Sequence, residues 1–262
     1  MSENILEINN LSKYFGGLAA VSDCSIKVKR GTITGVIGPN GSGKTTLFNL
    51  IAGNLKSSGG NVVFDDENIT DVPSYELFSK GLLRTFQIAH EFSNLSVLEN
   101  LMMVPGNQSG EKIMTALFKP GLVAQEEAVV KEKAKEVVEF LNLGHLSNEL
   151  AGNLSGGQKK LLELGRTMMV DAKFVLLDEV GAGVNRTLLK DLGTAIEKLN
   201  KEKGYTFCMI EHDMDFIGRL CDPVIVMAEG SVLFEGSVEE AKKDERVIES
   251  YLGRGSKLKD TN

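Results

Sequence analysis

The sequence lacks several features that would each define a class of protein. Its 262 residues include 29 basic and 36 acidic side chains, for a formal charge of −7, and no block of lysine and arginine forms a basic stripe. Nucleic-acid-binding surfaces need such a stripe, so we expect no nucleic acid partner. Its three cysteines, Cys24, Cys208 and Cys221, show no C-x-x-C spacing. We therefore expect a reducing compartment and no metal cluster, with Cys24 and Cys208 as small buried residues of strands.

Signals for secretion or membrane insertion are also missing. Residues 1–4 lack a basic segment followed by an apolar core, and no apolar run approaches the about 18 residues of a transmembrane helix. Any membrane connection is therefore expected to run through partner subunits. The chain shows no internal repeat, and its length suits one large α/β domain or a core with a smaller lobe.

A glycine-rich segment is the most informative stretch that is present. It fits the pattern G-x-x-x-x-G-K-[ST], and its residues are Gly38, Pro39, Asn40, Gly41, Ser42, Gly43, Lys44, Thr45 and Thr46. A strand-like run, Thr32–Ile37, precedes it, and apolar residues at helical spacing follow. Such a turn between strand and helix binds anions, because its backbone N–H groups surround a phosphate chain. We assign Lys44 to the β- and γ-phosphates and the Thr45 hydroxyl to Mg²⁺. Roughly 1–2% of chains this long would match the pattern by chance.

The remaining β-prone segments predict a sheet around this phosphate loop. Apolar residues alternate within residues 5–37, as in an antiparallel region. Further short runs predict strands at Asn61–Asp65 and Leu82–Phe86, at Phe174–Leu177 and Thr206–Ile210, and a hairpin at Val224–Met227 and Val232–Phe234, before a helix-prone stretch at Val238–Leu252.

Two of these strands end in titratable residues. The run Phe174–Leu177 leads into Asp178-Glu179, and Thr206–Ile210 leads into Glu211-His212. Central parallel strands deliver such side chains to the carboxyl edge of the sheet, where ligands bind. Solvated surface carboxylates and a structural histidine are the alternative interpretation.

Residues 88–166 have a different character. Their periodicity is helical, with Val130, Ala134, Val137, Val138 and Leu141 on one face of an amphipathic helix. Pro105–Gly110 and Pro120-Gly121 are expected to be loops within this lobe. We therefore predict a nucleotide-binding core at 1–87 and 167–252, a helical subdomain at 88–166 and a disordered tail at 253–262.

A second anion cradle is predicted at the start of a later helix. Leu154 precedes Ser155, Gly156, Gly157 and Gln158, just ahead of an apolar helical pattern. Alone, this run is more often a mobile loop. Because one nucleotide has one triphosphate, two cradles in one chain indicate that each caps a nucleotide held by the other cradle of a second subunit.

From about Ile5 to Leu252 the chain resembles the ATP-binding cassette (ABC) family, in the order and spacing of its motifs. The resemblance implies an α/β P-loop NTPase core, a mixed sheet with an antiparallel β region, plus an all-helical subdomain. In this comparison Phe15 resembles the aromatic residue that stacks on adenine, residues 38–46 resemble the Walker A loop, and Leu154–Gln158 resembles the signature motif.

The same resemblance assigns catalytic and metal-binding roles. Gln87 is similar to the Q-loop glutamine, Asp178 to the Walker B aspartate, Glu179 to the catalytic base and His212 to the switch histidine. Thr45, Gln87 and Asp178 are then expected around Mg²⁺, with ATP as the nucleotide. Residues 183–185 resemble the D-loop.

Two positions depart from the family pattern. Val180 stands where proline is usual after the catalytic glutamate, and Asn185 where the D-loop usually has aspartate. Neither change removes a phosphate, metal or water contact, so we expect an active site. A proline introduced at Val180 is expected to be tolerated.

The closer resemblance is to ATPase subunits of branched-chain amino acid importers. It rests on Phe15–Leu18, Arg84–Gln87, Ile210–Met214 and the ending Tyr251–Gly253. It implies a peripheral ATPase at the cytoplasmic face of the membrane, paired with an identical or related ATPase, bound to integral membrane permease subunits and served indirectly by an extracytoplasmic solute-binding protein. Urea, amide, lipopolysaccharide or lipid transporters, and a soluble ABC ATPase not tied to transport, remain alternatives.

Overall fold

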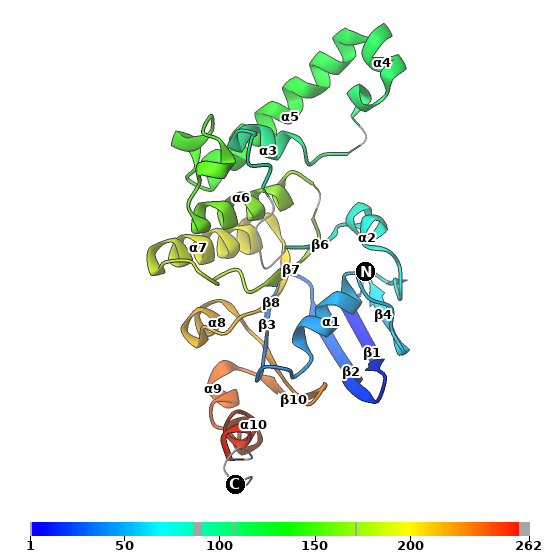
Figure 1. Cartoon of the computed structure of the whole chain (residues 1–262), viewed down its shortest axis with the longest axis vertical. Helices are drawn as coiled ribbons and strands as arrows, with labels where there is room; N and C mark the ends of the chain where they lie inside the picture. The colour runs from blue at the N-terminus through cyan, green and yellow to red at the C-terminus, as the bar shows by residue number, and fades with distance from the viewer. Residues whose placement is uncertain (1, 86–90, 107, 171, 257–262) are drawn as a thin grey trace. The chain divides into compact units, whose positions relative to one another are not determined.

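The computed structural model describes residues 2–85, 91–106, 108–170 and 172–256. The chain divides into two compact units (Figure 1). The first consists of Met1–Arg84, Lys173–Val180 and Glu197–Asn262, and the second of Thr85–Ala172 and Gly181–Ile196. All strands of the described chain belong to the first unit. The grouping of residues 181–196 with the second unit was not part of the sequence prediction.

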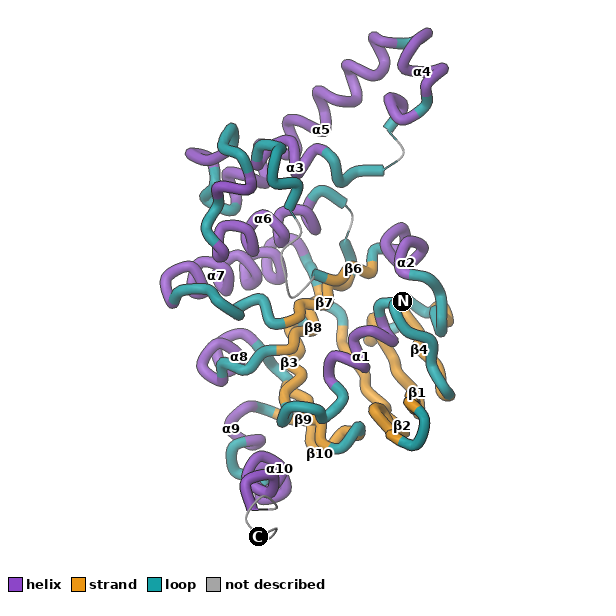
Figure 2. The backbone as a smooth tube through the Cα atoms, in the orientation of Figure 1, coloured by secondary structure: helices purple, strands orange, loops and turns teal. Residues whose placement is uncertain are grey.

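A six-stranded sheet forms the centre of the first unit, with strand order β10-β9-β3-β8-β7-β6 (Figure 2). Its strands are β3 (Ile33–Ile37), β6 (Leu82–Arg84), β7 (Phe174–Asp178), β8 (Thr206–Ile210), β9 (Val224–Ala228) and β10 (Ser231–Gly236). Five of them are parallel, and β10 pairs antiparallel with β9, which confirms the predicted hairpin. Every residue of β3, β7 and β8 is buried, as expected for continuous apolar runs in a covered parallel sheet.

A second sheet of the first unit is antiparallel, with strand order β2-β1-β4-β5. Its strands are β1 (Asn4–Phe15), β2 (Leu18–Lys29), β4 (Gly59–Phe64) and β5 (Glu67–Asn68). Buried and exposed residues alternate along the second half of β2, which is the pattern that predicted this region.

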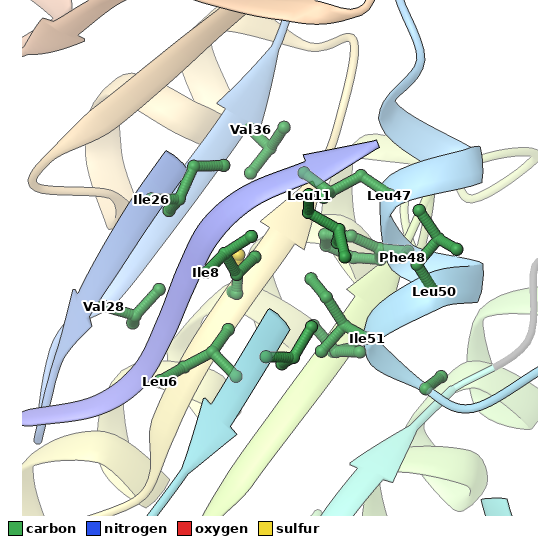
Figure 3. Packing of buried hydrophobic residues seen from close by; sticks show 14 of the residues in the cluster. Leu6, Ile8, Leu11, Ile26, Val28, Val36, Leu47, Phe48, Leu50 and Ile51 are labelled. Atoms are coloured by element: carbon green, nitrogen blue, oxygen red, sulfur yellow. The ribbon is translucent and has the colours of Figure 1, made fainter. Parts of the chain in front are cut away.

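The main hydrophobic core of the first unit involves this antiparallel sheet, the parallel strands and helix α1 (Lys44–Ile51) (Figure 3). Leu6 and Ile8 of β1 lie in it with Leu47 and Phe48 of α1, all at most 1% exposed. Full burial of each such side chain stabilises the fold by about 1.5–3 kcal/mol. The helix that follows the phosphate loop is therefore fixed by packing from its apolar face.

The described part of the first unit contains four further helices. They are α2 (Ser74–Lys80), α8 (Met214–Leu220), α9 (Val238–Ala241) and α10 (Glu245–Ser256). The single helix-prone stretch predicted at Val238–Leu252 is thus two helices. Helix α10 continues to Ser256, although a disordered tail was predicted to begin at residue 253. Residues 257–262 lie outside the described chain.

The described residues of the second unit form helices joined by loops. Its helices are α3 (Val97–Met102), α4 (Ile113–Phe118), α5 (Pro120–Phe140) and α6 (Gly156–Met168), with short 3-10 turns at Ser109–Glu111, Gly144–Leu146 and Ala151–Asn153, and α7 (Arg186–Lys203) starts here and ends in the first unit. Ala134, Val137 and Val138 of α5 are buried, which confirms the predicted apolar face. The predicted loop at Pro120-Gly121 is wrong: Pro120 begins α5, where its missing N–H costs no hydrogen bond.

No helix in the described ranges combines the length and the apolar character that crossing a membrane requires.

Candidate nucleotide-binding and catalytic site

The candidate site of the first unit lies where three neighbouring parallel strands end. Strand β8 pairs with β3 on one side and with β7 on the other, and Ile210 is opposite both Val36 and Asp178. The residues that follow these ends, namely the phosphate loop, Glu179 and His212, therefore start from one edge of the sheet. This confirms that the two titratable strand ends neighbour the phosphate loop.

The phosphate loop connects β3 to the start of α1. Gly38 has φ +145°, and a Cβ there would lie 2.1 Å from the carbonyl oxygen of Met227, so the loop path requires glycine. The N-cap of α1 is Gly43, and no side chain of the described residues caps it. The first turn of α1 also contains no acidic residue. An open helix N-terminus next to a tight glycine turn fits a phosphate group.

Backbone carbonyl groups of the phosphate loop hold the Lys44 side chain in place. Its Nζ donates to the carbonyl oxygens of Gly38 at 2.8 Å and Pro39 at 3.1 Å. The side chain is buried, so its charge lies at the loop rather than in solvent. A lysine in this position supplies a point charge to a phosphate oxygen.

Asp178 ends β7 and is 4% exposed. Its Oδ2 accepts from Nη2 of Arg84, the last residue of β6, at 2.6 Å. The Nη1 of Arg84 donates to Oδ1 of Asn49, in α1, also at 2.6 Å. One guanidinium thus joins the ends of β6 and β7 to the helix that follows the phosphate loop.

Glu179 and His212 meet at the ends of β7 and β8. The backbone N–H of Glu179 donates to the carbonyl oxygen of Ile210 at 2.9 Å, and the Glu179 backbone is left-handed, with φ +49°. Its Oε1 lies 3.0 Å from Nε2 of His212. Since a carboxylate only accepts, Nε2 carries the proton of this hydrogen bond. Both side chains remain partly accessible to solvent, at 23% and 49%.

The second cradle lies in the second unit, at the start of α6. Ser155 is the N-cap, and its side chain accepts from the N–H of Gln158, whose side chain in turn accepts from the N–H of Ser155. This capping box explains why the helix begins here. A Cβ on Gly157 would lie 2.6 Å from Cδ1 of Leu188, so α6 and α7 pack closely at this point. Ser155 and Gly156 are exposed.

Two other predicted residues are less constrained by the described structure. The Phe15 ring is 50% exposed at the end of β1, with Nζ of Lys13 5.3 Å from its centroid. An exposed ring of this kind is open to stacking, but nothing here brings it to the phosphate loop, and its role stays a prediction. Gln87 lies outside the described residues.

Comparison with known proteins agrees with this geometry. A family model described as ABC transporter matches residues 21–182. The chain belongs to the ABC transporter family.

Individual relatives cover nearly the whole cassette. This chain is 44% identical to the probable branched-chain amino acid transport ATP-binding protein LivG of Archaeoglobus fulgidus, over 95% of both chains. It is 42% identical to the corresponding LivG protein of Methanocaldococcus jannaschii, over 95% of this chain and 97% of the relative. A crystal structure of the ADP conformation of an ATP-binding cassette of an ABC transporter matches with a TM-score of 0.81 and 39% identity, over 96% of this chain and all of that one.

The oxygen donors of the cassette suit Mg²⁺. Thr45 offers a hydroxyl in the first turn of α1, and Asp178 a carboxylate at the end of β7. Mg²⁺ prefers such hard oxygen ligands and keeps several water molecules, so two protein ligands beside phosphates suffice.

Both departures from the family pattern have a local structural role. Val180 is 3% exposed and contributes to the core. Asn185 accepts through Oδ1 from the N–H of Leu188 at 3.0 Å, so its side chain caps the first turn of α7.

Sequence reasoning assigned no role to three residues that contact the predicted site directly or through one another. Arg84 and Tyr251 were named only as parts of a resemblance, and Asn49 was not considered. Tyr251 in α10 interacts with the backbone of Gly38; burial raises the Tyr251 pKa, and this interaction opposes the rise. These contacts join positions far apart in sequence, and no local pattern signals them.

Proposed function

We propose that this chain is the ATP-hydrolysing subunit that powers uptake of branched-chain amino acids. The observation that carries the proposal is the match over nearly the full length of two relatives named for branched-chain amino acid transport. The open helix N-terminus after the glycine turn, with Lys44 held at the loop, supports the nucleotide site of the proposal.

The protein groups have separate tasks in this hydrolysis. Backbone N–H groups of residues 38–46 and the Lys44 ammonium bind the phosphates of ATP. Thr45 and Asp178, together with Gln87, would hold Mg²⁺, which when bound neutralises charge on the phosphates. Glu179 orients the attacking water and accepts its proton, while the hydrogen bond from His212 fixes the carboxylate.

The proposed working form contains two cassettes. Ser155 and Gly156, which are exposed, and the neighbouring Gly157 of one cassette are proposed to face the γ-phosphate bound by another cassette, identical or related. Integral membrane permease subunits are proposed to carry the cassettes at the cytoplasmic face of the membrane, and an extracytoplasmic solute-binding protein to deliver substrate to the permease. The segment around residues 88–104 is the proposed permease contact.

Uptake by cells tests the transported substrate. Cells lacking this chain should regain uptake of radiolabelled leucine, isoleucine and valine when the wild-type gene is returned. Lys44→Ala should not restore it, because the variant loses the charge aimed at the phosphates. Restored uptake of urea, with no effect on the three amino acids, would reject the proposed substrate while leaving the ATPase assignment intact.

Nucleotide binding tests the site independently of transport. Calorimetry of the purified chain should show at least about tenfold weaker ATP binding for Lys44→Ala, since a charge-assisted phosphate contact is lost. Lys80→Ala, which breaks an exposed ion pair with Glu67 in the same unit, is the control and should bind ATP normally.

A further inference from the structure

Arg84 contacts two elements of the nucleotide site without belonging to any assigned motif role. Its Nη2 donates to Oδ2 of Asp178 and its Nη1 to Oδ1 of Asn49, each at 2.6 Å. All three residues lie in the first unit. The pairing of β6 with β7 places Arg84 opposite Leu176, two residues before Asp178, so the guanidinium reaches the carboxylate along the sheet edge.

The ion pair between Arg84 and Asp178 is largely buried. The side chains of Arg84 and Asp178 are 11% and 6% exposed. The Nε of Arg84 is buried and has no hydrogen-bond partner among the described residues. A buried charge pair with an unsatisfied donor is a poor source of stability, because desolvation offsets most of the attraction. The arrangement instead places a fixed positive charge beside the carboxylate expected to face the metal.

We propose that Arg84 is a positioning residue that holds the Asp178 carboxylate when no metal ion is bound. Arg84 then competes with the metal ion for the negative charge of this carboxylate. This inference rests on the proposed function, in which Asp178 contributes to the Mg²⁺ site. Arg84 engages Oδ2, so Oδ1 is the oxygen left for the ion or its water ligands. Asn49 accepts from the other terminal nitrogen of the guanidinium and so links this state to α1.

Competition between two cations for one carboxylate has a definite sign. Removing the guanidinium charge leaves Asp178 with less neutralisation, so Mg²⁺ binds at lower concentration. The same change frees the carboxylate to turn, so catalysis slows. A merely structural arginine would lower stability and turnover without lowering the Mg²⁺ requirement.

The test is a Mg²⁺ titration of the purified chain with a fluorescent ATP analogue, in the Glu179→Gln background so that nucleotide is not consumed. Arg84→Gln keeps a hydrogen-bonding amide but no charge, and should lower the half-saturating Mg²⁺ concentration by roughly three- to tenfold. Arg84→Lys keeps the charge and should stay within about twofold of the parent. With Glu179 intact, Arg84→Gln should also turn over several-fold more slowly.

Controls separate the possible outcomes. Arg30→Gln breaks another arginine–aspartate pair of the same unit, with Asp65, and should leave the Mg²⁺ requirement unchanged. Asp178→Asn should raise that requirement; if it does not, the metal assignment of the proposed function fails. If Asp178→Asn behaves as expected but Arg84→Gln leaves the requirement unchanged or raises it, only the role of Arg84 is rejected. If Arg84→Gln does not fold, Asn49→Ala is the deciding variant. It removes the hydrogen bond that fixes Arg84, so the half-saturating Mg²⁺ concentration must fall by about twofold.

Discussion

Nε2 of His212 lies 3.0 Å from Oε1 of Glu179, although the two residues are 33 positions apart. The contact arises because both residues follow the ends of adjacent parallel strands, where Asp178 is opposite Ile210. A histidine that donates to a carboxylate fixes its orientation and leaves the second oxygen for a water molecule.

Glu179→Gln is expected to bind ATP and hydrolyse it at least about a hundredfold more slowly, because general-base catalysis contributes roughly 10²–10⁴-fold. Phosphate release measures turnover, and fluorescence of an ATP analogue measures binding. Glu229→Gln is a matched control, since Glu229 has a similar left-handed backbone, φ +48°, but lies in the turn between β9 and β10. Wild-type turnover by Glu179→Gln would remove Glu179 as the base.

Ser155→Arg should abolish an ATP-dependent dimer. In the Glu179→Gln background we expect a monomer without nucleotide and a dimer with Mg-ATP, because bound phosphates supply the attraction between cassettes. Sedimentation velocity distinguishes the two states. A dimer that forms without nucleotide and survives Ser155→Arg would contradict the composite site.

The Ser155 substitution also removes an N-cap, which costs about 1 kcal/mol. Ser96→Arg is therefore the control, because Ser96 forms the same capping box at α3 within the second unit. It should lose similar stability and still dimerise.

Val180→Pro is expected to lower both stability and turnover, contrary to the tolerance predicted from the sequence. Glu179 has φ +49°, and a residue before proline is driven toward extended conformations. The substitution therefore strains the catalytic residue, and it also removes the buried Val180 side chain. We expect a loss of about 1–3 kcal/mol by urea unfolding. Val180→Ala removes the side chain alone, and equal turnover of the two variants would show that the backbone of Glu179 is not strained.

Asp65→Asn should destabilise the first unit at neutral pH but not in acid. Hydrogen bonds from Lys173 and Arg30 hold the pKa of Asp65 below its ordinary value. A depressed pKa contributes stability above the unfolded value, near pH 4, and that stability is lost as the pH falls through the folded value. Because the groups are partly solvated, we expect about 1 kcal/mol or less at neutral pH.

Urea unfolding at several pH values measures this effect. The difference between wild type and Asp65→Asn should shrink as the pH falls below about 4. Asp66→Asn is the control, since neighbouring Asp66 is exposed and forms no ion pair in the described chain. A difference that grows in acid would show that Asp65 is not held by its cationic partners.

The local sequence determined the phosphate loop, the buried strands and the start of the helix that Ser155 caps. Each depends on residues within about one turn or one strand: glycines that permit the loop, apolar runs that require burial, and a serine and a glutamine three apart that form a capping box. The placement of Asp178, Glu179 and His212 at strand ends followed from the same runs, because parallel strands present their carboxyl ends at one edge.

Tertiary structure alone decided how these groups meet one another. Arg84 reaches Asn49 and Asp178 across 35 and 94 positions, and the left-handed backbone of Glu179 accompanies its pairing with Ile210. Side-chain partners and strained backbone angles depend on which segments pack together, and that packing is set by the whole core rather than by neighbours in sequence.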